Sequence, residues 1–331
     1  MLNNKSFVID ACIYPEAEFE GCAEDIKQSK LDAFFLTVPG DSFEGAIKSI
    51  SRTYLLSDDE TEKFKVARNY NDLIANKNND KMSAILYFQD PYPIGNKIEL
   101  VRAFYELGIR VIQMSYNKGG CIAGGGVEGG NYGLTDFGRE VVKEMNRLGM
   151  LIDLSHCGEK TINDVFEVTN KPVTFCHANV YEISRNPRNK SDDQLKSLAK
   201  NGGVIGLTPW APILWNGKKN VPPTIDDYLD HVDYVVKLIG IDHVGFASDN
   251  NLDHSEDIIG INEQSSLYSD VVGPYNTKVG TDPKERHAIG FKGATDIDNL
   301  IRNMKKRGYH DEDIDKFLGG NFLRVLKEVW R

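Results

Sequence analysis

The sequence lacks the segments by which a chain enters or crosses a membrane. Its first residues, Met1 to Ser6, contain no apolar run of the kind that secretory signals have. No later segment has enough consecutive apolar residues to span a bilayer. The five cysteines form no CxxC pair, and their odd number is typical of reduced thiols. We therefore expect a soluble cytoplasmic protein with free cysteines.

An excess of basic residues is also lacking. The 49 Asp and Glu residues outnumber the 39 Lys and Arg residues, and the net charge is −10. This charge argues against nucleic acid or an anionic membrane surface as a partner. Hydrophobic residues make up 40% of the 331 residues, which is ordinary for a globular protein with a large core. The length suits either two average domains or one barrel with long loops.

Short apolar runs alternate with helical patterns along almost the whole chain. Several runs lack polar residues at alternate positions, as strands that are buried on both faces do. In residues 136–148, apolar side chains recur at helical spacing, and Gly149 then supplies a stop signal. We predict strands at residues 7–11, 33–38, 83–88, 110–115, 151–154, 173–176, 204–207 and 244–247, with helices that include 99–107, 136–148, 192–200 and 225–239.

Eight strands with helical crossovers predict an α/β fold, a closed (β/α)₈ TIM barrel. An open, doubly wound sheet is the alternative. Residues 250–293 look rich in loop-forming residues, and two further helices are expected at 297–307 and 311–330. The sequence therefore predicts a single domain over residues 1–331, with a long loop after the eighth strand and C-terminal helices.

Polar residues stand where a barrel of this kind carries its catalytic groups, at the C-terminal ends of the strands. Gln89, Tyr116, His156, His177 and Asp249 each fall at or just past the end of a predicted strand. The two histidines belong to adjacent strands, and imidazole is a common zinc ligand, so they indicate a metal site. The alternative is that they only form hydrogen bonds in the barrel mouth.

Other residues with metal-binding or nucleophilic side chains are sorted by the same rule. His254 follows the eighth predicted strand and is placed to reach the mouth. His243 precedes its strand and is expected to be structural, while His287 lies in a polar loop. Cys12 comes just past the first predicted strand, which makes it the cysteine nearest to the expected site.

Residues 124–129 match the pattern G-x-G-x-x-G of dinucleotide-binding proteins. That motif must join a strand directly to a helix N-terminus, so that the pyrophosphate meets the free amides. Here the strand ends near Ser115 and the next helix begins near Asp136. We expect instead a mobile loop over the site, carrying Glu128 towards it.

Seven stretches of the sequence carry a family resemblance. They are GLTDFGREVV at 133–142, MNRLGM at 145–150, DLSH at 153–156, KPV at 171–173, RN at 188–189 followed by DD at 192–193, VGF at 244–246 and GNFLRVL at 320–326. In their order they resemble the membrane (renal) dipeptidase family, peptidase M19, of the amidohydrolase superfamily. The resemblance is good from residue 83 to the C-terminus and weak before it.

The resemblance implies a metallopeptidase with zinc in the barrel mouth, and a homodimer. In this family one zinc takes a histidine from each of the fifth and sixth strands, and these match His156 and His177. The arginine that binds the substrate carboxylate matches Arg188. The aspartate that handles protons after the eighth strand matches Asp249.

Other positions depart from the family pattern. The His-x-Asp pair of the first strand falls at Cys12 and Tyr14, and the glutamate that bridges the two zinc ions falls at Gln89. The histidine that contacts the substrate carbonyl falls at Tyr116. The first zinc site is therefore expected to be lost. A bacterial branch of the family is similar in these respects and has a loop glutamate, which Glu128 resembles.

These matches lead to a one-metal hypothesis. We expect one zinc per chain, bound by His156 and His177 and completed by Glu128, Asp249 or Cys12. Catalytic zinc ions usually have three protein ligands, so a third is needed. A chain that binds no zinc is the alternative.

The expected activity is the hydrolysis of a small amide or dipeptide-like substrate that bears a carboxylate. In this scheme Asp249 moves protons, Tyr116 donates to the developing oxyanion, and Arg188 binds the substrate carboxylate. Gln89 and Glu128 are further candidates for contact with the substrate.

Two other functions remain open on the same scaffold. One is a non-hydrolytic lyase or decarboxylase, and the other is a catalytically inactive protein that binds a small molecule. Trp210 follows the seventh predicted strand and is expected to shape a pocket or an interface, or simply to pack in a loop.

Overall fold

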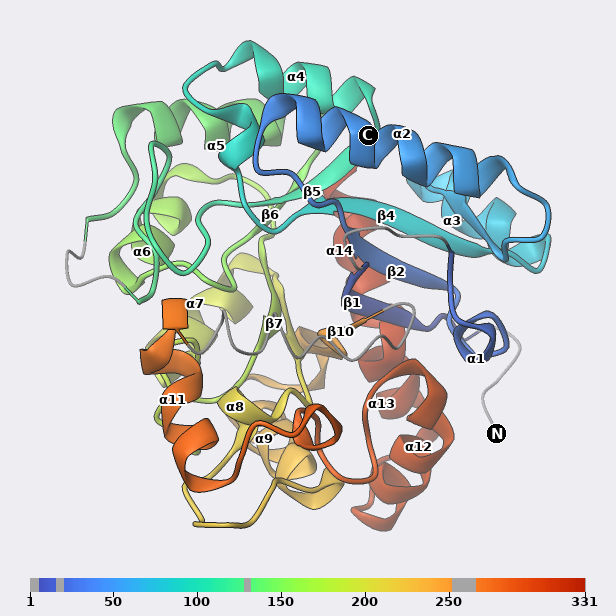
Figure 1. Ribbon diagram of the computed structural model, residues 1–331, viewed down its shortest axis with the longest axis vertical. Helices are drawn as coiled ribbons and strands as arrows, with labels where there is room; N and C mark the ends of the chain where they lie inside the picture. Colours follow the sequence, from blue (N-terminus) through green and yellow to red (C-terminus); the bar gives the residue numbers. More distant parts are fainter. Residues whose placement is uncertain (1–5, 16–20, 128–131, 252–265, 331) are drawn as a thin grey trace.

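The strands of the computed structural model form one curved, all-parallel sheet (Figure 1). The structure describes residues 6–15, 21–127, 132–251 and 266–330. Along the sheet the strands follow the order β10-β1-β2-β4-β5-β6-β7-β8-β9, and β3 pairs with β4 off this path. Their bounds are β1 Ile9–Tyr14, β2 Ala33–Thr37, β3 Phe64–Val66, β4 Met82–Phe88, β5 Ile109–Gln113, β6 Leu151–Asp153, β7 Thr174–Ala178, β8 Val204–Leu207, β9 Val244–Phe246 and β10 Asn250–Asn251.

The two ends of this path meet, because β9 and β10 are consecutive parts of the eighth barrel strand. β9 pairs with β8, whereas β10 pairs with β1 through Ile13 and Asn250. Between them, the backbone N–H of Asp249 donates to the carbonyl oxygen of Cys12 at 2.9 Å. The sheet is therefore closed as a barrel, and the open doubly wound alternative is wrong.

Helices cover the outside of the barrel (Figure 1). Their ends follow the sequence signals. Thr135 accepts a hydrogen bond from the Gly138 N–H at the start of α5, and Gly149 ends that helix at φ 79°. The helices are α1 Glu24–Lys27, α2 Phe43–Asp58, α3 Tyr70–Asn78, α4 Glu99–Glu106, α5 Asp136–Leu148, α6 Glu159–Val168, α7 Asp192–Asn201, α8 Ala211–Leu214, α9 Ile225–Ile239, α11 Ser269–Lys278, α12 Ile297–Lys306, α13 Asp311–Asp315 and α14 Asn321–Val329.

One end of the barrel is closed by α14. Its apolar residues Phe322, Val325 and Val329 are fully buried and share a core cluster with strand residues such as Ile9 and Ala33. Those strand residues come early in their strands, so α14 plugs the N-terminal end. The C-terminal end is left for polar side chains, as in other barrels of this type.

The eight predicted barrel strands are all present, with shifted ends. β1 extends to Tyr14 and β7 to Ala178, so Cys12 and His177 lie inside strands and not just past them. The short strands β3 and β10 were not predicted.

Two helical predictions are corrected by the structure. Residues 250–293 are not only loop, because α11 forms there despite Pro274 in its interior. The last helix is divided into α13, the π-helical segment Lys316–Gly320, and α14. The break occurs where a side chain on Gly319 would come within 2.2 Å of the Phe7 carbonyl oxygen.

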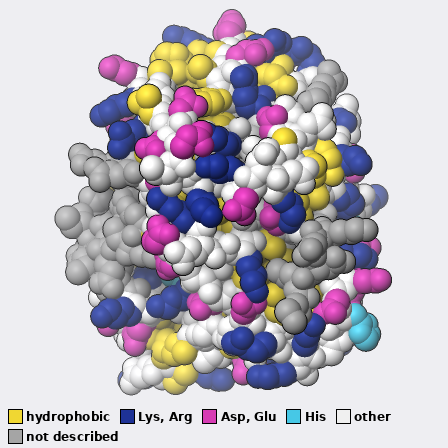
Figure 2. Space-filling view, turned by 90° about the vertical axis from the view of Figure 1, so that its right-hand side faces the viewer, with side chains coloured by type: hydrophobic (Ala, Val, Ile, Leu, Met, Phe, Trp, Pro, Cys, Tyr) yellow, Lys and Arg dark blue, Asp and Glu magenta, His cyan; other side chains and the backbone are white. Residues whose placement is uncertain are grey.

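Positive and negative side chains are intermixed on the surface. Figure 2 shows Lys and Arg side chains beside Asp and Glu side chains over the face turned to the viewer. Among the described residues, no helix is both long enough and apolar enough to cross a membrane.

Candidate active site

A cavity of about 150 Å³ opens at the C-terminal end of the barrel. Five of the residues singled out from the sequence as site candidates line it. The walls come from residues at the ends of β1, β4, β5, β6 and β10, from the loops after β7 and β8, and from α11. The lining residues are Tyr14, Gln89, Tyr116, Asn117, His156, Arg188, Trp210, Asp249, Tyr268, Val271 and Val272.

His156 lines this cavity and forms a pair with His177, which is not itself a lining residue. Their Nε2 atoms lie 2.8 Å apart, and both side chains are buried. Nδ1 of His156 lies 2.7 Å from the side-chain oxygen of Asn117, which can only accept a hydrogen bond. Nδ1 of His156 therefore carries the ring proton, and its Nε2 accepts from Nε2–H of His177.

Burial keeps both imidazoles neutral. It lowers the pKa of His156 and of His177 well below the ordinary value, and the nearby positive charge of Arg188 lowers both further. A neutral imidazole is the form that binds a metal ion. Nδ1 of His177 has no hydrogen-bond partner among the described residues.

Two further donors stand next to this pair. The Cys12 sulfur, one ring nitrogen of His177 and a carboxylate oxygen of Asp249 all lie within 4.8 Å of one another. The Cys12 thiol donates to Oδ1 of Asp249 at 3.5 Å. Burial, followed by the charge of Asp249, raises the pKa of this thiol well above its usual value.

Asp249 is held in an unusual backbone conformation. Its φ is 51°, in the left-handed region that few non-glycine residues adopt. Its N–H bond to Cys12 and a contact of its carbonyl oxygen with Nε2 of His287 at 3.4 Å fix this turn. Burial raises the pKa of the Asp249 carboxyl, and Arg188 opposes the rise. Backbone strain of this kind is often found at functional sites.

Gln89 presents the wrong end of its amide for a metal. Its Nε2 lies 2.9 Å from the Cys12 sulfur and 2.9 Å from Oγ1 of Thr37. The side-chain NH₂, which repels a cation, therefore faces the place where a bridging carboxylate is needed.

The donors divide into one set that fits zinc and one that does not. His156 and His177, with Cys12 and Asp249 beside them, offer the nitrogen, sulfur and oxygen donors that zinc takes in proteins. The set at Cys12, Tyr14 and Gln89 contains no charged ligand pair and does not fit a second ion.

Arg188 brings a buried positive charge to the cavity wall. Its side chain is 3% exposed, and Nη2 donates to the carbonyl oxygen of His177 at 3.3 Å. Nε has no partner among the described residues. Burial lowers the pKa of Arg188, while Tyr116 and Asp249 oppose this effect. Arg188 can therefore donate a charge-assisted hydrogen bond to a bound anion.

Tyr116 covers the histidine pair with its ring. It stacks on His156 with ring centroids 4.1 Å apart and an angle of 22°, and Tyr268 meets it edge-on at 5.8 Å. Burial raises the pKa of the Tyr116 phenol. The phenol is therefore a hydrogen-bond donor at neutral pH.

At residues 124–127 the glycine-rich segment packs against neighbouring backbone, and the rest of the loop expected over the site lies outside the described residues. Gly126 N–H donates to the carbonyl oxygen of His156 at 2.8 Å. A side chain on Gly125 would come within 2.3 Å of the Asn117 carbonyl oxygen, so only glycine fits. Glu128 and His254 lie outside the described residues.

Some cavity residues were not identified from the sequence. Asn117 directly follows Tyr116, but no spacing rule marks it as a partner of His156. Tyr268, Val271 and Val272 come from the segment that looked like loop. The Val-Val pair followed by Tyr275 at helical spacing is the signal that could have revealed α11, and Pro274 argued against it. Trp210 lines the cavity. The sequence had left open whether it shapes a pocket or an interface or packs in a loop.

Lys190 is a further buried cation near the site. Its side chain is 2% exposed, and Nζ donates to the Leu154 carbonyl oxygen at 3.2 Å and lies over the ring of Phe175. Burial, with Arg188 as the second cause, lowers the pKa of Lys190 to about 7.

Comparisons with known proteins agree with the resemblance in the sequence. The model of the membrane dipeptidase family, peptidase family M19, matches residues 19–271 and 265–331. An uncharacterized dipeptidase of Schizosaccharomyces pombe is 34% identical over 265 residues, which are 78% of this chain and 55% of that protein. A dipeptidase of Claviceps purpurea is 27% identical over 81% of this chain and 56% of its own length. The chain thus spans about half the length of these two curated relatives.

A solved structure matches almost the whole chain. The crystal structure of an amidohydrolase from Pseudomonas aeruginosa superposes with a TM-score of 0.85 and 29% identity. The match covers 99% of this chain and 97% of that one.

Proposed function

Because this chain belongs to the membrane dipeptidase family, peptidase family M19, we propose that it hydrolyses a small, dipeptide-like amide that bears a carboxylate. One observation carries the proposal. His156, whose Nε2 lies 2.8 Å from Nε2 of the buried His177, lines one cavity with Arg188 and Asp249, and Nε of Arg188 has no hydrogen-bond partner among the described residues. Amide hydrolysis needs an activated water, a stabilised oxyanion and a proton for the leaving amine.

One zinc ion per chain is part of this proposal. His156 and His177 would hold it, with Cys12 or Asp249 as the third protein ligand. When bound there, zinc supplies a Lewis acid and lowers the pKa of a coordinated water to about 7. To bind zinc through Nε2, His177 would carry its ring proton on Nδ1, which has no hydrogen-bond partner among the described residues, and both imidazoles would remain neutral.

The other residues take roles that follow from their positions. Arg188 binds the substrate carboxylate and so fixes the direction of the amide in the cavity. Tyr116 donates its phenolic proton in a hydrogen bond to the oxygen on which negative charge develops. The carboxylate of Asp249 takes a proton from the attacking water and returns it to the nitrogen of the leaving amine.

Turnover of a dipeptide panel tests this proposal. Purified protein supplied with zinc is expected to release free amino acids, and a chelator is expected to abolish the release. The variant with His156→Ala and His177→Ala should lack both bound zinc and activity. A surface variant, His310→Ala, controls for the loss of histidine, since His310 begins α13 away from the cavity lining.

The same panel separates the alternatives. Activity that survives complete removal of metal would contradict the zinc proposal and favour metal-free chemistry on this scaffold. Stabilisation of the protein by dipeptides without any turnover would instead favour a binding protein.

A further inference from the structure

The cavity has an aliphatic wall that the proposed reaction does not use. Val271 and Val272, at the start of α11, are the aliphatic side chains among the described residues that line it. They are 2% and 1% exposed, and they form an apolar cluster with Ile213 of α8, against which Trp210 packs. A ligand in the cavity therefore meets both polar groups from the strand ends and a hydrocarbon surface from α11.

Asn186 links this wall to Arg188. Its side-chain Nδ2 donates to the carbonyl oxygen of Val271 at 2.8 Å, and its Oδ1 accepts from the N–H of Arg188 at 3.1 Å. Asn186 is 6% exposed, so water competes little for these bonds. One buried side chain thus sets how far the start of α11 lies from the backbone of Arg188, the residue proposed to bind the substrate carboxylate.

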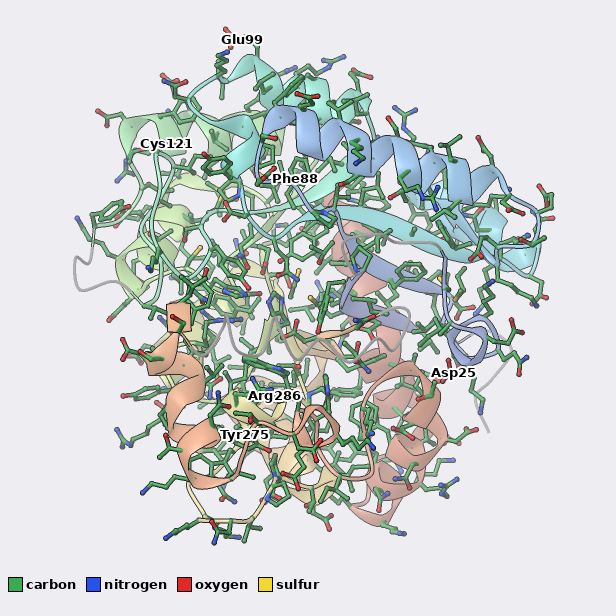
Figure 3. The ribbon with its side chains drawn as sticks, in the orientation of Figure 1. Asp25, Phe88, Glu99, Cys121, Tyr275 and Arg286 are labelled. Atoms are coloured by element: carbon green, nitrogen blue, oxygen red, sulfur yellow. The ribbon has the colours of Figure 1, made fainter. Side chains whose placement is uncertain are left out.

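The second half of α11 is anchored as well. The phenol of Tyr275 donates to the carbonyl oxygen of Glu285 at 2.5 Å. Arg286, which lies next to Tyr275 (Figure 3), donates from Nη1 to the side-chain oxygen of Asn276 at 2.6 Å. The central carbon of its guanidinium also lies 5.5 Å from the ring centroid of Trp210. Both halves of α11 are therefore joined to the residues that form the cavity, and the helix can hold a ligand at a defined place.

The cavity is small for a dipeptide. Its volume of about 150 Å³ is that of a closed protein cavity which holds one benzene molecule. Beside a carboxylate and an amide, the room that remains suits a side chain of a few carbon atoms. Such a side chain gives up no hydrogen bond with water when it packs on the two valines, whereas a hydroxyl group does.

We propose that Val271 and Val272 form a side-chain subsite, which selects dipeptide-like substrates with a short aliphatic side chain next to the carboxylate. Arg188 takes the carboxylate, and the adjacent side chain packs on α11 at the distance that Asn186 sets. This inference rests on the proposed function for its class of substrate, and it names which members of that class the cavity accepts.

The experiment compares two ligands of the same shape, N-methanesulfonyl-valine and N-methanesulfonyl-threonine. They differ only by a methyl and a hydroxyl group in the side chain, and a sulfonamide in place of the amide prevents their hydrolysis. Binding of both enantiomers of each is measured by calorimetry on zinc-supplied protein. For the enantiomer that binds more tightly, the unaltered protein is expected to prefer the valine ligand about tenfold.

Two variants of Val272 test the wall itself. Val272→Thr places a hydroxyl group on the wall and should lower the preference to about threefold or less. Val272→Ala makes room and should bind the corresponding leucine ligand about tenfold more tightly than the unaltered protein does. Val279→Thr is the matched control, because Val279 lies at the end of α11 and does not line the cavity, and its preference should stay near about tenfold.

Equal affinity for the two ligands in the unaltered protein would overturn the inference, as would an unchanged preference in Val272→Thr or the absence of any binding. If Val272→Thr does not fold, Val272→Ala decides, and a leucine ligand that it binds no better than the unaltered protein does would contradict the subsite. Because binding is measured apart from turnover, a preference for valine without hydrolysis of dipeptides would contradict the hydrolase proposal alone. Hydrolysis without the preference would contradict the subsite alone.

Discussion

His156 and His177 meet through their Nε2 atoms, 2.8 Å apart, at the ends of the neighbouring strands β6 and β7. Only one proton can lie between two nitrogen atoms at this distance. Asn117 decides on which ring it lies, because its side-chain oxygen takes Nδ1–H of His156 and leaves Nε2 of that ring as the acceptor. The tautomer of the pair is therefore fixed by Asn117, which is not one of the proposed metal ligands.

Asn117→Ala is expected to weaken zinc binding about 10–100-fold, because the His156 ring loses the partner that orients it. Competition with a metal chelator of known affinity measures the change. Asn117→Asp keeps an acceptor at the same position and should bind zinc at least as well as the unaltered protein. Equal zinc affinity in the alanine variant would show that the tautomer is set in another way.

Restoring charged ligands is expected to add a second metal ion. The combined changes Cys12→His, Tyr14→Asp and Gln89→Glu replace two neutral side chains and a thiol by an imidazole and two carboxylates. Metal analysis should then rise from about one to about two zinc ions per chain. Cys12→Ala alone serves as the control and should not exceed one. A folded triple variant that still binds one ion would indicate that the irregular pairing of β1 between Asp10 and Ile13 misdirects the new ligands.

Arg188→Lys should raise KM for dipeptide-like substrates about 10–100-fold, because a lysine cannot form two parallel N–H hydrogen bonds to a carboxylate. kcat should change less, since the reacting groups remain in place. Arg185→Lys, three residues earlier and exposed, is the matched control and should leave KM as it is. A fall in kcat at constant KM would assign Arg188 to the reaction itself and contradict a binding role.

Lys190 is expected to make stability depend on pH. Its pKa is lowered from the ordinary value to about 7 in the folded chain, whereas in the unfolded chain it is about 10.4. Between these values the unfolded chain binds one more proton, so the free energy of unfolding rises with pH by up to about 1.4 kcal/mol per pH unit. Below pH 7 Lys190 is protonated in both the folded and the unfolded chain, and its contribution to the free energy of unfolding is lowest.

Urea unfolding from pH 6.5 to 9 of the unaltered protein and of Lys190→Met measures this effect. The methionine variant should be the more stable one at pH 6.5, and the difference should shrink as pH rises. A difference in the free energy of unfolding that stays constant with pH would show that the pKa of Lys190 is the same in the folded and the unfolded chain.

The sequence was sufficient for the barrel because its strands are buried on both faces. Uninterrupted apolar runs marked β2, β4 and β8 within a residue of their observed bounds. β10 could not be found in this way, since two asparagines carry no strand signal and pair with β1 only when the barrel closes. α11 was missed because the Gly, Asp, Ser and Asn residues scattered through 250–293 indicated loop.

The candidate site was predictable to the extent that strand ends converge. Gln89, Tyr116, His156 and Asp249 follow predicted strand ends and line one cavity, whereas Arg188, which also lines it, was identified through the family resemblance. The direction of the Gln89 amide depends on hydrogen bonds to Cys12 and Thr37, two residues distant in sequence.

The short eighth strand places a residue of the candidate site, Asp249, at a thinly paired junction of the barrel. β10 contributes two residues to its pairing with β1, and the bond from Asp249 N–H to the Cys12 carbonyl oxygen lies at the same junction. Local opening is cheapest where few backbone bonds hold a segment. Heating should therefore displace Asp249 while the longer strand pairs, such as β2 with β4, remain intact. The temperature at which the proposed activity is lost is then expected to lie below the temperature at which the barrel unfolds.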